Sequence, residues 1–160
     1  MTDTSSNTNA KQRIHLRRGQ GVANSLIRTL LATPLLSRAV GRRLVTIYVV
    51  GRKSGRRYTI PVNYLRDGND MIVGTPFPWA RNLRTGEPVE VRHLGRRRRA
   101  DVVVYTDEAA VARYYDALCR DNGVFANLNK IALDSAGNPD PQDIHEAWAA
   151  GARVLRLSVV

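Results

Sequence analysis

The spacing of apolar residues changes after about residue 43, from a helical period to the alternation typical of strands. Between Gly21 and Val40 apolar residues recur every three or four positions, which predicts an amphipathic helix that Pro34 kinks or divides. Short β-branched runs then predict strands over 44–50, 58–66, 71–75, 88–94, 98–105 and 153–160. Turn signals at Asp67-Gly68 and Gly95 separate consecutive strands, so the pattern indicates a meander.

Two further helical segments are predicted between these strands. Residues 78–87 predict a short helical turn that ends near Gly86, and Thr106 or Asp107 can cap a helix that runs to about Arg120. The acidic stretch 134–143 is rich in Pro, Gly and Asn and predicts a loop. Short strands with helices before and among them predict an α+β fold around a small split antiparallel β-barrel.

The length of 160 residues fits one compact domain. The polar residues 1–19 predict a disordered tail, which leaves 20–160 as the folded domain. A lone cysteine, Cys119, and the lack of any Cys/His cluster with zinc spacing favour the cytoplasm and no metal. No apolar run approaches the roughly 20 residues of a membrane span, so the helix over 21–40 either covers the core or lies on a membrane surface.

Positive charge is concentrated in the first two thirds of the chain. Residues 1–100 carry 20 Lys and Arg against 5 Asp and Glu, whereas residues 101–160 carry 5 against 9. This balance suits an anionic partner, which could be a phosphorylated small molecule, an acidic membrane surface or nucleic acid. Few aromatic residues lie among the arginines and no nucleic-acid recognition motif is present, which argues against nucleic acid.

The densest basic motif is the turn within VGRKSGRRYTIPV, residues 50–62. Its spacing is neither that of a P-loop nor that of a dinucleotide-binding glycine motif. A glycine-bounded turn can present backbone N–H groups to an anion, with Arg52, Lys53 and Ser54 around it. The alternative is a solvated hairpin tip whose charges keep the sheet edge soluble. A second basic run, Arg96–Arg99, indicates an exposed hairpin.

The tryptophan and histidine side chains are also considered as candidate site residues. Trp79 can fill the barrel core or lie against a flat ligand. The three histidines, His15, His93 and His145, have no partner that the sequence can place, so no catalytic triad and no metal site is assigned.

The run LVTIYVVGRKSGRRYTIPVNYL, followed by FPWARNL, resembles the deazaflavin-dependent nitroreductase family of the split β-barrel flavin-binding superfamily. The resemblance covers about residues 20–160 and is most specific over 50–61 and 78–83. Tyr58 departs from the family, which commonly has an arginine at this place, and Arg57 is the candidate substitute. The segment VGTPFPW is also shorter than its counterpart in the family.

The resemblance implies a reductase that transfers a hydride from the reduced deazaflavin coenzyme F420 to a quinone, nitroaromatic or enone acceptor, with no dedicated catalytic residue. It implies that the basic turn holds the coenzyme's phosphate and acidic tail, while the Trp79 segment meets its ring. The implied coenzyme-binding residues are Arg52, Lys53, Ser54, Gly55, Arg57, Tyr58, Pro61, Trp79 and Asn82. Tyrosines late in the chain form a substrate gate in some relatives, and the candidates here are Tyr114, Tyr115 and Phe125.

Two alternatives to this function remain open. The coenzyme could be FMN in place of the deazaflavin. The protein could also be a non-catalytic module that docks on an anionic membrane or binds a lipid through residues 21–40 and the basic turn.

Overall fold

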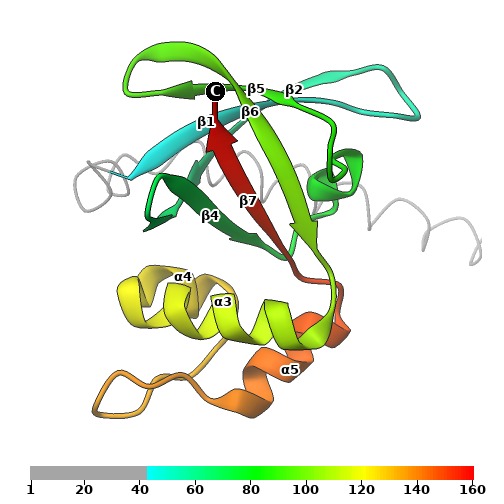
Figure 1. The fold of residues 1–160 in the computed structure, drawn as a ribbon. Coiled ribbons are helices and arrows are strands. Elements are labelled where there is room, and N and C mark those ends of the chain that lie inside the picture. Colours follow the sequence, from blue (N-terminus) through cyan, green and yellow to red (C-terminus); the bar gives the residue numbers. More distant parts are fainter. Residues whose placement is uncertain (1–42) are drawn as a thin grey trace, which may run out of the picture. The chain divides into compact units, whose positions relative to one another are not determined.

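The computed structural model describes residues 43–160, and Figure 1 shows their fold. The strands are β1 (Leu44–Val50), β2 (Arg57–Asn63), β3 (Leu65–Asp67), β4 (Asp70–Thr75), β5 (Val89–His93), β6 (Arg96–Tyr105) and β7 (Arg153–Val159). The helices are the 3-10 turn η1 (Pro78–Asn82), α3 (Glu108–Asp121), α4 (Gly123–Leu128) and α5 (Pro141–Ala149). The predicted tail over 1–19 and the predicted amphipathic helix over 21–40 lie outside the described residues.

The strands form one curled antiparallel sheet in the order β2-β1-β5-β6-β7-β4-β3. Its two edge strands, β2 and β3, are consecutive in the chain, and Tyr64 is the single residue between them. The chain therefore bends at Tyr64 from one edge of the sheet to the other, which curls the sheet into a split barrel. The α+β split-barrel prediction is confirmed.

Two strand predictions need correction. The predicted strand 58–66 is two strands, because its first half pairs with β1 and its second half with β4. A simple meander is also wrong, since β4 pairs with β7 and not with the next strand, β5. The predicted turns are confirmed at Gly68 and Gly95, which both adopt positive φ.

Strand alternation fills the barrel interior. In β1, Val45, Ile47 and Val49 are buried whereas the residues between them are not fully buried. We call the interior cluster the barrel core; it comprises Val45, Ile47, Val49, Tyr64, Met71, Val73, Trp79, Ala80, Val89, Val91, Ala100, Val102, Leu155 and Leu157.

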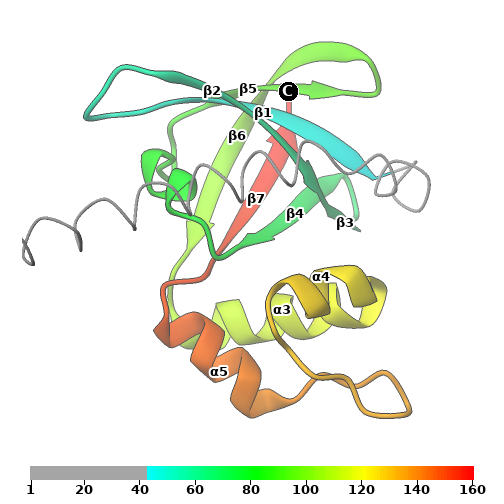
Figure 2. The same cartoon turned by 180° about the vertical axis from the view of Figure 1, so that it is seen from behind.

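Helices α3 and α4 lie against β4 and β7, and α5 packs against α3 on the side away from the sheet (Figures 1 and 2). Ile72 of β4 and Val154 of β7 point toward these helices. Their neighbours Met71, Val73 and Leu155 point into the barrel. We call this second cluster the helix core; it comprises Ile72, Val111, Tyr114, Tyr115, Leu118, Cys119, Ala126, Ile131, Ile144, Ala152 and Val154.

The helix predictions are confirmed in part. The Asp107 side chain accepts a hydrogen bond from the Ala110 N–H and caps α3, which ends one residue beyond the predicted Arg120. The loop prediction over 134–143 is wrong at its end, because Asp140 caps α5 and Pro141 occupies its first turn. Within residues 43–160 no helix is both long and apolar enough to cross a bilayer.

Candidate functional site

The basic turn between β1 and β2 is closed by backbone hydrogen bonds. The Gly51 N–H donates to the Arg56 carbonyl at 2.8 Å, and the Gly55 N–H donates to the Gly51 carbonyl at 2.7 Å. Gly55 has a φ of +64°, and a Cβ on Gly51 would lie 2.7 Å from the Ser54 Oγ. The positive φ of Gly55 favours glycine there, and a side chain at Gly51 would displace the Ser54 hydroxyl. That hydroxyl accepts a further bond from the Arg56 N–H.

Arg52 joins the basic turn to η1, thirty residues later in the chain. Its backbone N–H donates to the Asn82 Oδ1 at 3.0 Å, and its Nε donates to the Asn82 carbonyl at 2.9 Å. The Asn82 side-chain amide in turn donates to the Trp79 carbonyl at 2.9 Å. These bonds bring together the two sequence motifs, GRKSG and PWARN, that the sequence analysis singled out.

An open groove of about 800 Å³ lies where β1 and β5 separate beyond their last pair, Tyr48 with Glu90. One part of its wall is apolar or aromatic and comprises Tyr48, Val49, Val50, Tyr58, Leu83, Pro88 and Val89. The other part is polar or glycine and comprises Gly51, Arg52, Gly55, Arg57, Thr59, Asn82, Arg84, Glu87, Glu90 and Arg97. This combination suits a ligand with a flat apolar ring and an anionic group.

Two of the four arginines in the groove are already paired with carboxylates. Arg52 forms a salt bridge with Glu87. Arg97 bonds to Glu90 at 2.8 Å, and its guanidinium carbon lies 4.6 Å from the centre of the Tyr48 ring.

The other two arginines in the groove are Arg57 and Arg84. Neither forms a salt bridge with any residue in the described range 43–160. Both side chains are therefore the cations most available to an anionic ligand.

The structure divides the predicted coenzyme-binding residues into two groups. Arg52, Gly55, Arg57, Tyr58 and Asn82 line the groove. Arg57, the candidate substitute for the family's arginine, and Tyr58 both border the groove at the start of β2.

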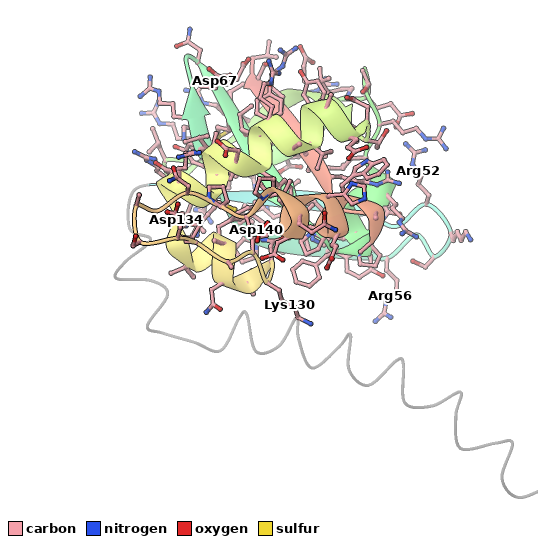
Figure 3. The ribbon with its side chains drawn as sticks, turned by 90° about the horizontal axis from the view of Figure 1, so that it is seen from below. Arg52, Arg56, Asp67, Lys130, Asp134 and Asp140 are labelled. Carbon is pink, nitrogen blue, oxygen red and sulfur yellow. The ribbon has the colours of Figure 1, made fainter. Side chains whose placement is uncertain are left out.

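Lys53, Ser54, Pro61 and Trp79 are not among the groove-lining residues. Lys53 and Ser54 are exposed on the turn, and Pro61 is exposed on the edge strand β2 opposite Thr46. Trp79 is 9% exposed and packs in the barrel core. Of its two interpretations, its position agrees with the one in which it fills the core. Figure 3 shows Arg52 and Arg56 on the turn, at the opposite end of the molecule from Asp134.

The three candidate gate residues lie elsewhere, against the helices. Tyr114 and Tyr115 belong to the helix core, and Phe125 packs against it. The Tyr115 hydroxyl donates to the Asn129 Oδ1 at 3.3 Å, and its ring meets the Phe125 ring at 5.2 Å between centroids. None of the three lines the groove, so a gate function stays a prediction without support from this geometry.

Sequence reasoning missed several residues of the groove, namely Tyr48, Arg84, Glu87, Glu90 and Arg97. A partial signal was present, because Tyr48 and Val50 alternate with the buried residues of β1 and so had to face outward. Their meeting with Glu90 and Arg97 depends on the pairing of β1 with β5, which the sequence does not specify.

A second polar contact lies at the other end of β1. The Tyr64 hydroxyl and the His93 Nε2 are 2.9 Å apart, and their rings make an edge contact at 5.5 Å. Burial, followed by the nearby charges of Arg98 and Arg66, lowers the pKa of His93. Among residues 43–160, no three His, Cys, Asp or Glu side chains gather in an arrangement that would hold a metal ion.

The chain matches no protein-family model and no curated protein at a significant level. Among solved structures it is similar to an FAD- and heme-binding protein from Mycobacterium smegmatis, with 21% identity, a TM-score of 0.44 and coverage of 74% of this chain. The chain spans 62% of that protein's length.

Two further solved structures are similar to the chain. One is a proposed 5-nitroimidazole antibiotic resistance protein from Bacteroides thetaiotaomicron VPI-5482, at 9% identity and a TM-score of 0.45, with 80% of each chain covered. The other is an FAD-binding protein from Mesorhizobium loti, at 13% identity and a TM-score of 0.46, with 80% of this chain and 90% of that one covered. These similarities are too distant to assign a function. The proposed function therefore rests on the groove.

Proposed function

We propose that the protein is an oxidoreductase that holds a flavin-type coenzyme in the groove beside the basic turn and transfers a hydride to a small acceptor. The observation that carries this proposal is the pair of hydrogen bonds from Arg52 to Asn82. These bonds place the basic turn and η1 in one wall of a groove that also has an apolar side. The resemblance of the same two motifs to deazaflavin-dependent nitroreductases makes coenzyme F420 the first candidate and a quinone, nitroaromatic or enone the acceptor.

The donor set of the groove fits such a coenzyme. A volume of about 800 Å³ is within the range of small-molecule sites. Arg57 and Arg84 would hold the anionic group, since guanidinium groups bind phosphate in two-point geometry. The apolar side chains Val50 and Leu83 would contact the ring and exclude water.

When bound and reduced, the coenzyme supplies the hydride, so the protein's task is to position donor and acceptor. Arg52 and Asn82 fix the wall of the groove, because the backbone and side-chain bonds of Arg52 fasten the turn to η1. No acid or base from the chain is assigned to the reaction.

FMN is a second candidate for the coenzyme. The two glutamates of the groove favour it, because they reduce the positive charge that is free to bind an anion. Glu87 and Glu90 already neutralise Arg52 and Arg97, so the four arginines of the groove do not present four free charges. Such a site suits a single phosphate better than a long polycarboxylate tail, which Glu87 would repel.

A hydride-transfer assay tests the proposal. The protein is mixed with reduced deazaflavin coenzyme, and separately with reduced FMN, and oxidation of the coenzyme is followed after addition of a quinone or a nitroaromatic compound. We expect protein-dependent oxidation with at least one coenzyme, and a strong decrease in the Arg57→Gln/Arg84→Gln variant. Oxidation at the rate without protein for every coenzyme and acceptor pair would contradict the proposal.

A further inference from the structure

The tip of the β5–β6 hairpin presents a strained and exposed leucine. It is a two-residue turn, Leu94-Gly95, in which both residues adopt positive φ, +49° and +77°. Such turns favour Asn, Asp or Gly at both places, and a leucine is strained there. Leu94 is also 79% exposed, more than any other large apolar side chain in the described range 43–160.

The strands beside this tip place like charges opposite each other. Arg92 is paired in register with Arg97. Like charges directly across a strand pair are destabilising. The hairpin thus keeps an exposed, strained leucine next to repelling arginines, although neither contributes to the barrel core.

The arginines of the hairpin are largely available to an external partner. Arg92, Arg96, Arg98 and Arg99 are exposed, and none of the four forms a salt bridge within residues 43–160. Among residues 43–160, the Arg92 side chain donates only to the Gly95 carbonyl, at 3.4 Å. Arg97 is the exception, because it is paired with Glu90.

Strand alternation distributes these charges over both faces of the hairpin. Arg97 and Arg99 point to one face, and Arg96 and Arg98 point to the other. A partner that wraps the tip from all sides uses both faces, as a lipid headgroup layer does around an inserted apolar residue. A nucleic acid duplex would contact one face and would gain nothing from an exposed leucine.

We infer that the β5–β6 hairpin docks on an anionic lipid surface, with Leu94 inserted among the acyl chains and the surrounding arginines bound to lipid phosphates. Each basic residue near an acidic bilayer increases the affinity for the bilayer, and an inserted apolar side chain increases it further. In Figures 1 and 2 the hairpin projects on the side of the barrel opposite the basic turn between β1 and β2. A docked hairpin would therefore leave the groove open to the aqueous phase.

Flotation of the full chain with vesicles tests this inference. Vesicles of phosphatidylcholine alone are compared with vesicles that also contain phosphatidylserine. We expect binding to the acidic vesicles only, weakened about tenfold by Leu94→Asn, which keeps a residue suited to positive φ. Arg96→Gln/Arg98→Gln should weaken it by about fivefold per arginine. The matched control, Lys53→Gln/Arg56→Gln, removes the same charge from the basic turn and should bind nearly as the unmodified chain does.

A second readout reports the position of residue 94 itself. Cys119 is the only cysteine in the sequence and is buried, so Leu94→Cys can be labelled selectively with a polarity-sensitive fluorophore. A blue shift on addition of acidic vesicles supports insertion. The inference is overturned by no vesicle binding, by binding that Leu94→Asn leaves unchanged, or by no shift of the label in bound protein. Tighter binding to duplex DNA than to acidic vesicles at the same salt, with no effect of Leu94→Asn, would also overturn it.

Discussion

Arg52, Arg57 and Arg84 have different surroundings although all three line the groove. Arg52 is held by Asn82 and Glu87, so its replacement would loosen the turn as well as remove a charge. Arg57 and Arg84 make no salt bridge with the described residues, so their replacement changes the charge of the groove with little effect on the fold. They are therefore the better probes of coenzyme binding.

We expect Arg57→Gln and Arg84→Gln each to weaken coenzyme binding by about tenfold, since a charge-assisted hydrogen bond contributes roughly 1.5–3 kcal/mol when well formed. The midpoint of urea unfolding should stay within error of the unmodified protein. Fluorescence titration with the coenzyme gives the affinity.

Lys53→Gln is the matched control for these two variants, because Lys53 is on the same turn but does not line the groove. It should weaken binding by no more than about twofold, through long-range charge alone. A loss for Lys53→Gln as large as for Arg57→Gln would mean that the anionic group binds on the outer side of the turn.

The half-buried position of His93 predicts how stability depends on pH. Its pKa is lowered from the ordinary value of 6.5 by burial and by the charges of Arg98 and Arg66. The unfolded chain then binds a proton more readily than the folded one, so the stability present above about pH 6.5 is lost as the pH falls below it. His93→Gln keeps a polar side chain beside Tyr64 and does not titrate. Urea unfolding at about pH 7.5 and about pH 5 gives the free energy of unfolding at each pH. This free energy should decrease less between the two pH values for His93→Gln than for the unmodified protein, and an equal decrease would contradict the prediction.

At the scale of elements, the contact of β4 with α3 and α4 depends on Gly74. A Cβ at this position would lie 2.7 Å from the Phe125 Cζ and 2.8 Å from the Leu118 Cδ1. The side chains are packed in or against the helix core, so there is little space for them to move.

We expect Gly74→Ala to lower the free energy of unfolding by about 1–3 kcal/mol through overpacking. Gly123→Ala is the control, because its Cβ would meet only the Leu133 Cδ1, at 3.8 Å, at the start of α4. That variant should be neutral or slightly stabilising. Urea unfolding of both variants gives the comparison, and equal stability of Gly74→Ala and the unmodified chain would mean that α4 can shift away from β4.

The alternation of apolar residues was enough to predict most strands, including β1 and β7 at nearly their observed bounds. It did not reveal that the chain changes sheet edge at Tyr64, because the residues on both sides continue one extended pattern. The short helices α4 and α5 were missed since neither has enough residues to show a helical period clearly.

The candidate site was predictable only where it is local in sequence. The basic turn and the PWARN segment were recognisable as motifs, and the structure brings them together through Arg52 and Asn82. Glu87 and Arg97 reach the groove because β5 pairs with β1, which is distant in the chain. No local sequence pattern predicts this pairing. The position of Trp79 in the barrel core depends likewise on the curl of the whole sheet.

At the scale of the whole molecule, the two basic regions and the helix layer occupy different places. The groove lies at the start of β5 and the Leu94-Gly95 tip of the hairpin at its other end, although Arg97 of the hairpin also lines the groove. The helices lie on the side of β4 and β7. Helices α3, α4 and α5 lie within residues 101–160, where acidic residues predominate with 9 Asp and Glu against 5 Lys and Arg. An anionic small molecule and an anionic surface could therefore bind at the same time, each at a basic region.

We propose that the groove beside the basic turn binds a flavin-type coenzyme. An equilibrium fluorescence titration of the full chain with the oxidised deazaflavin coenzyme, FMN and FAD, at one moderate salt concentration, measures this binding. We predict a Kd in the micromolar range or below for at least one of them, weakened in Arg57→Gln and weakened further as salt is raised. No binding of any of the three, even at low salt, would contradict the account.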